Sequence, residues 1–157
     1  MSCLRTVVPI VALASSGPAW AEEVGQWRGK AVLVSTQITT SQVADQEDHV
    51  LMLGDDSGLV FNEDGQAFLD KAEYRVQWML DTSGMVGGGY KTFTTADGQV
   101  FAKFTITEDT DAGVAGTWEF TGGTGKYQGI AGRGTFDVTN VSDTVYWDVL
   151  EGEYKIP

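Results

Sequence analysis

The sequence predicts an all-β protein, a closed antiparallel up-and-down barrel of about eight strands. Three observations support this prediction. Short runs alternate between apolar and polar residues and are rich in β-branched and aromatic side chains, as half-buried strands are. Turn dipeptides with glycine separate the runs, and the 157 residues include 20 glycines but only 3 prolines. With 42% hydrophobic residues, the chain has enough apolar material to bury one core.

The first 21 residues read as a secretory leader. Arg5 supplies the positive start, residues 6–14 the apolar run, and residues 19–21 (AWA) the small-x-small cleavage pattern. The alternative, a membrane anchor, needs about 20 apolar residues, roughly twice the length of this run. We therefore expect an exported protein, periplasmic or extracellular, that is not inserted in a membrane after cleavage. Its single domain, residues 22–157, carries a net charge of −13.

The first half of this domain contains an apolar, β-branched run at residues 31–38 (AVLVSTQI). Two shorter apolar runs follow at residues 49–53 and 59–61, on either side of the acidic pair Asp55-Asp56, which we interpret as a solvated turn. Residues 74–80 (YRVQWML) alternate strictly between apolar and polar side chains. Each of these runs predicts a strand.

The second half repeats the pattern with clearer turns. Asp97-Gly98 separates the strands expected at residues 90–95 and 100–107, and Asp111-Ala112-Gly113 precedes the strand at 117–120. The last two strands are expected at residues 135–141 and 144–150. A helical turn fits only at residues 43–50 or 66–72, and neither shows a long 3.6-residue period.

Eight to ten strands in a domain of this size favour a barrel, and the tryptophans suggest which faces point inward. Alternation places Trp78, Trp118 and Trp147 each on an apolar face of its strand, and Tyr74 shares the face of Trp78. We expect Tyr74, Trp78, Trp118 and Trp147 to line the lumen, either as plain core or as the wall of a ligand site.

Composition excludes several functions. Nucleic acid is not an expected partner, because a phosphate backbone needs a basic surface and the chain is acidic. Cys3 lies in the leader, so the mature chain has no thiol for catalysis, zinc or haem. His49 is the single histidine, beside Glu47 and Asp48, which would raise its pKa. Residues 109–113 fall one position short of a calcium loop. We expect no cofactor and no metal beyond a weak surface calcium site.

Residues 122–134 (GGTGKYQGIAGRG) are the most glycine-rich stretch. They match neither a P-loop nor a dinucleotide fingerprint, so we interpret the glycines as places where a strand bends or approaches another backbone closely. The stretch resembles the GG-[ST]-G-x-[FY]-x-G-x-x-G-x-[GA] signature of the allene oxide cyclase barrel group, a calycin-like family that includes dirigent proteins and secreted bacterial proteins. The resemblance implies an eight-stranded barrel with a hydrophobic lumen, often a trimer. The resemblance gives no positions here for the cyclases' catalytic glutamate, asparagine and cysteine, and the mature chain has no cysteine.

Three acids within strands are the candidates for catalysis: Glu119, Asp137 and Asp148. An acid that faced the lumen would have its pKa raised by burial and would suit acid–base chemistry. If the tryptophans point inward, however, alternation places all three acids in water.

The leading hypothesis is an exported, non-enzymatic barrel that binds a small hydrophobic or aromatic ligand in its lumen. The first alternative is an isomerase or cyclase similar to the allene oxide cyclases or dirigent proteins, which requires at least one acid inside the lumen. The second is a structural or assembly protein whose apolar outer faces form a homo-oligomer.

Overall fold

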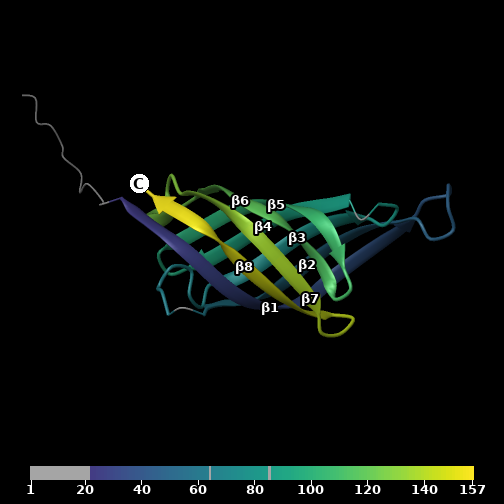
Figure 1. Cartoon of the computed structure of the whole chain (residues 1–157), viewed down its shortest axis with the longest axis horizontal. Helices are drawn as coiled ribbons and strands as arrows, with labels where there is room; N and C mark the ends of the chain where they lie inside the picture. Colours follow the sequence, from purple (N-terminus) through teal and green to yellow (C-terminus); the bar gives the residue numbers. More distant parts are fainter. Residues whose placement is uncertain (1–21, 64, 85) are drawn as a thin grey trace, which may run out of the picture.

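The computed structural model describes residues 22–63, 65–84 and 86–157, and the predicted leader lies outside these residues. Eight strands form one closed barrel in which each strand pairs antiparallel with its chain neighbours (Figure 1). The barrel closes between the first and last strands, where Glu23 pairs with Ile156 and Val34 with Val145. The predicted fold class is confirmed.

The strands vary in length, and the first is long enough to extend past the barrel wall. In chain order they are β1 (Glu23–Gln42), β2 (Val50–Asn62), β3 (Glu73–Asp81), β4 (Val86–Thr95), β5 (Gly98–Thr110), β6 (Gly113–Gly123), β7 (Ala131–Asn140) and β8 (Val145–Ile156), with one 3-10 turn, η1 (Gly125–Tyr127). A register shift between Ser35 and Gln37 bends β1. Beyond it, the β1–β2 hairpin projects from one end of the barrel (Figure 1).

The region around Asp55-Asp56 differs from the sequence prediction. The two runs expected as separate strands form one continuous strand, β2, and the acidic pair lies within it instead of in a turn. Asp55 forms an ion pair with Arg75 on the outer face, while Asp56 points inward and is buried. Neither segment in which a helical turn fitted contains a helix; residues 43–49 and 66–72 are turns and loops.

The antiparallel order divides the turns between two ends of the barrel. The β1–β2, β3–β4, β5–β6 and β7–β8 turns lie at one end, which we call the mouth. The β2–β3 loop, the β4–β5 turn and the segment containing η1 lie at the other, together with the start of β1 and the end of β8. We call this the closed end, because side chains fill it.

The closed end is filled by a cluster of aromatic rings around Trp27 of β1. Trp27 is almost fully buried and meets Phe68, Phe93 and Trp118 edge to face, with ring centroids 5.5 to 5.7 Å apart. The ring of Phe68, from the β2–β3 loop, stacks on that of Tyr154 at 3.7 Å. Such edge-to-face and offset contacts add to the hydrophobic gain of burying large rings. This aromatic plug is therefore a major part of the core.

The glycine-rich stretch makes room for this plug. A Cβ on Gly134 would lie 2.7 Å from the ring of Trp118 and 1.9 Å from the carbonyl oxygen of Glu151, and one on Gly132 would lie 2.7 Å from Phe120. Gly125 and Gly129, in the turn before β7, have positive φ values of 59° and 80°. The stretch therefore turns the chain and approaches a neighbouring backbone closely, as the sequence suggested, and it also leaves room for the rings of Trp118 and Phe120.

The part of the chain that the structure describes contains no helix of the length and apolarity that crossing a bilayer requires.

Candidate functional site

The mouth half of the lumen holds a cavity of about 630 Å³. Its wall is largely apolar, with Val76 and Trp78 from β3, Ile106 from β5 and Val138 from β7 among its lining residues. These side chains come from alternate, inward positions of their strands, as the barrel geometry requires. Both the volume and the apolar lining are typical of sites for small molecules.

The floor of this cavity carries a buried ion pair. Nζ of Lys91, on β4, lies 2.7 Å from Oδ2 of Asp148, on β8, and also donates to Oη of Tyr74 at 2.7 Å. The Tyr74 hydroxyl donates to the same Asp148 oxygen at 2.6 Å. Lys91 and Asp148 are 2% and 1% exposed, so these contacts replace almost all their hydration.

The electrostatics of the floor follow from this burial. Removal from water lowers the pKa of Lys91, an effect that the nearby charge of Asp148 opposes. Burial raises the pKa of Tyr74 well above its ordinary value, and the carboxylate of Asp148 adds to the rise. The tyrosine therefore stays a hydroxyl. Nζ of Lys91 also lies 4.5 Å from the ring centroid of Phe136 and 4.8 Å from that of Phe104, which is favourable cation–π geometry.

A second buried acid, Asp56 of β2, also lines the cavity. Its Oδ1 accepts a hydrogen bond from Oγ of Ser35 at 2.6 Å, and its Oδ2 accepts one from Nε1 of Trp78 at 2.7 Å. The hydroxyls of Ser35 and Tyr146 lie 2.9 Å apart and continue the network. Burial raises the pKa of Asp56, while the two donors act in the opposite direction.

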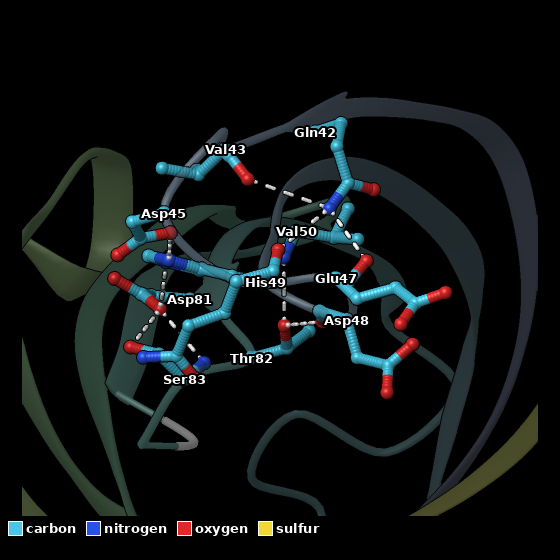
Figure 2. Close-up of polar contacts among 11 residues, drawn as sticks. Gln42, Val43, Asp45, Glu47, Asp48, His49, Val50, Asp81, Thr82 and Ser83 are labelled. Carbon is cyan, nitrogen blue, oxygen red and sulfur yellow. Dashed lines mark hydrogen bonds and ion pairs between the residues drawn. The ribbon is translucent and has the colours of Figure 1, made fainter.

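At the mouth, His49 links the β1–β2 turn to the end of β3 (Figure 2). Its Nδ1 lies 2.6 Å from Oδ1 of Asp45 and its Nε2 lies 2.9 Å from Oδ1 of Asp81. These acids raise the pKa of His49, the hydrogen bond with Asp45 being the largest cause. The sequence neighbours Glu47 and Asp48, which we expected to act on His49, are not among the causes.

Three of the four predicted lumen residues point inward, but they lie in different parts of the lumen. Trp78 is half-buried and lines the cavity, with its ring against Gly54, where a Cβ would lie 2.1 Å away. Trp118 belongs to the aromatic plug. Tyr74 lies between the two regions, because its ring stacks on Phe93 of the plug at 4.7 Å while its hydroxyl reaches Asp148 at the floor.

The inward orientation predicted for Trp147 is wrong. Trp147 lies on the outer wall, 37% exposed, with Nζ of Lys30 4.4 Å from its ring centroid. It pairs with Val32 of β1, which in turn pairs with Leu59 of β2, so an apolar outer surface crosses three strands. The homo-oligomer expected from the sequence stays a prediction, which the mass of the protein in solution would test.

Of the three candidate acids, one lies inside the lumen and two lie on the outer wall. Asp148, expected in water because Trp147 was expected inside, is the buried acid at the cavity floor. Glu119 and Asp137 are exposed on the outer wall, and Glu119 forms an ion pair with Lys103 at 2.6 Å. The structure brings Asp148 together with Tyr74 and leaves the other two acids outside the lumen.

Sequence reasoning missed two members of the site, Lys91 and Asp56. Asp56 looked like part of a turn because it lies in the sequence Gly-Asp-Asp-Ser-Gly. Lys91 lies two residues from Phe93 in β4 and therefore on the same face of the strand, which would have placed it inside. That signal is weak, because the other face of the strand carries Tyr90 and two threonines.

Within the described residues, no three or more His, Cys, Asp or Glu side chains gather as metal ligands would.

Comparison with solved structures finds a similar barrel in a protein of very different sequence. A pterocarpan synthase dirigent protein matches with a TM-score of 0.57 at 10% identity, over 88% of this chain and 88% of that one. A pyocyanin demethylase matches with a TM-score of 0.48 at 17% identity, over 80% and 98% of the two chains, and a second pterocarpan synthase dirigent protein with 0.41 at 11%, over 85% and 95%. No protein-family model and no curated protein sequence matches the chain. The chain therefore has the barrel fold of a dirigent protein, at an identity that transfers no activity.

Proposed function

We propose that this protein binds a small, largely apolar or aromatic molecule in the mouth half of its barrel. The observation that carries the proposal is the cavity of about 630 Å³, whose apolar wall ends on a floor of buried polar groups. A mostly apolar pocket with a few convergent polar groups is the usual form of a small-molecule site. The apolar wall supplies affinity, and the buried polar groups of the floor orient the ligand.

The proposal can be tested by titrating the protein with a panel of apolar, aromatic and phenolic compounds while following tryptophan fluorescence. Trp78 lines the cavity and is expected to report binding as a saturable change. Val138→Phe places a larger side chain in the cavity and is expected to abolish the change. Val86→Phe is the matched control, since Val86 is 69% exposed on the outside. Unchanged binding by Val138→Phe would contradict a site in the lumen.

A second candidate function is an isomerase or cyclase, for which the sequence required an acid inside the lumen. Asp148 and Asp56 are both inside and both line the cavity. Because burial raises the pKa of Asp56, this carboxyl is suited to hold a proton and transfer it to a bound substrate.

This second candidate predicts a stereochemical effect. An allene oxide supplied as its methyl ester would cyclise to an excess of one enantiomer with the protein present, measured by chiral chromatography. Asp56→Asn would remove the excess and Glu119→Gln would retain it. A racemic product with the unmodified protein would exclude this reaction while leaving ligand binding untouched.

A further inference from the structure

We infer that the cavity selects ligands by charge and by hydrogen bonding: it accepts a neutral or cationic molecule that donates a hydrogen bond to Oδ1 of Asp148, and it rejects anions of the same shape. The inference rests on the proposed binding function and names the chemical class of the ligand. Two independent observations carry it, one at the floor and one along the whole lining.

The first observation is an incomplete set of hydrogen bonds at the floor. Both donors to Asp148, Lys91 and Tyr74, reach the same oxygen, Oδ2. Its Oδ1 is buried and has no hydrogen-bond partner among the described residues. A buried carboxylate oxygen without a donor is unfavourable, so a donor brought by a ligand gains more here than it would at an exposed acid. A hydroxyl or an N–H group fits this position, whereas a carboxylate offers only acceptors.

The second observation is the charge of the lining. The cavity is lined by five aspartates, namely Asp56, Asp109, Asp111, Asp143 and Asp148, and by a single cation, Lys91. Lys91 is already paired with Asp148. Within the residues that the structure describes, the three aspartates at the mouth form no ion pair. An entering ligand therefore meets an excess of negative charge, which a low-dielectric wall strengthens.

The two observations assign different parts of the ligand. Near the floor, a neutral donor suits Oδ1 best, because a cation there would also lie close to Lys91. Toward the mouth, Asp109, Asp111 and Asp143 favour a positive group. An anion is unfavourable at both levels, because the aspartates at the mouth would repel its charge and its oxygens could not donate a hydrogen bond to Oδ1.

Four compounds with one ring system test this inference: 2-(2-naphthyl)ethanol, 2-(2-naphthyl)ethylamine, 2-ethylnaphthalene and the carboxylate of 2-naphthylacetic acid. Calorimetric titration of the unmodified protein is expected to give the lowest Kd values for the alcohol and the amine. The hydrocarbon should bind about tenfold more weakly than the alcohol because it lacks a donor, and the carboxylate more weakly still. Added salt should weaken the binding of the amine and leave the affinity for the alcohol unchanged.

Variants separate the two parts of the inference. The double variant Asp109→Asn, Asp111→Asn should reduce the difference in Kd between the amine and the carboxylate. It should preserve the difference in Kd between the alcohol and the hydrocarbon. The control double variant Asp97→Asn, Asp137→Asn removes the same number of negative charges at positions that do not line the cavity. It should change neither difference in Kd. Asp148→Asn should remove the preference for the alcohol over the hydrocarbon. If that variant fails to fold, the four compounds on the unmodified protein still decide the inference.

The outcomes distinguish this inference from the binding function on which it rests. If none of these compounds, and no member of the wider panel, binds, the proposed function itself fails. If the four bind with equal affinity, or the carboxylate binds most tightly, the cavity is a ligand site and the selection inferred here is overturned.

Discussion

The two halves of the lumen are built from the same eight strands and differ in what their inward side chains do. At the closed end, rings such as Trp27 and Trp118 contact one another edge to face and lie close against glycines of the wall. At the mouth, the inward positions include Asp56, Lys91 and Asp148 around open space. Closed packing and a polar cavity thus occupy separate lengths of one barrel, and the difference indicates that the plug stabilises the fold while the mouth half is available for recognition.

The largest expected effect comes from removing one tryptophan from each half. Trp118→Ala should lower the free energy of unfolding by about 3–5 kcal/mol, because it leaves a cavity in the packed plug. Trp78→Ala should cost less, about 1–3 kcal/mol, since its ring already borders open space and the main loss is its hydrogen bond to Asp56. Urea unfolding of both variants measures the difference. An equal cost would mean that the two halves are packed alike.

The second prediction concerns the ion pair at the boundary between the halves. Asp148→Asn should destabilise the protein by about 3–5 kcal/mol, because it leaves the Lys91 ammonium buried without a counter-charge. Asp137→Asn, on the outer wall, should change stability by less than about 0.5 kcal/mol. Thermal unfolding of the two variants gives the comparison.

A double variant then tells whether charge or packing is responsible. Lys91→Met combined with Asp148→Leu removes both charges and should recover most of the lost stability, since apolar replacement of a buried pair is often neutral. A double variant as unstable as Asp148→Asn would show that the polar network itself holds the two halves together.

Asp56 gives a smaller effect that depends on pH. Burial raises its pKa above the ordinary 3.8, so the folded protein binds this proton more tightly than the unfolded chain does. The contribution of Asp56 to stability is therefore greatest below pH 3.8 and declines as the pH rises toward the raised pKa. Asp56→Asn should gain stability relative to the unmodified protein over that window, measured by urea unfolding at several pH values. A constant difference between the two would contradict the shift.

The smallest effect is expected at His49, outside the lumen. Its raised pKa means that the attraction to Asp45 and Asp81 is fully present below pH 6.5 and is lost as the pH rises through the folded-state pKa. Hydrogen exchange at the amide of Val43, which donates to the His49 carbonyl oxygen, should accelerate over that range beyond the normal chemical increase. His49→Gln should show only the chemical increase. Global stability should hardly change.

The sequence was sufficient for the barrel because alternation and turn residues act locally. It was not sufficient for β8, where the predicted orientation rested on the apolar face that Trp147 shares with Val145 and Val149. Further along that strand, the face of Trp147 carries charged residues, namely Glu151, Glu153 and Lys155. The face of Asp148 carries Leu150 and Tyr154. Reading the whole strand would have placed Trp147 outside and Asp148 inside.

The rest of the site needed distances between strands that local patterns do not contain. Lys91 and Asp148 are 57 residues apart and meet only because β4 and β8 face each other across the lumen. Asp56 was misread because glycines on both sides resemble a turn. In the barrel one of them, Gly54, instead accommodates the ring of Trp78.

The pairing of β1 with β8 also has a consequence for folding kinetics. Seven of the eight strand pairs join chain neighbours, but the closing pair joins Glu23 to Ile156 at opposite ends of the domain. Contacts between distant residues form slowly, since most of the chain must be ordered first. Until closure, β1 and β8 each present an unpaired edge, and on β1 that edge includes the apolar segment from Ala31 to Val34. Self-association during refolding should therefore compete with closure and increase with protein concentration.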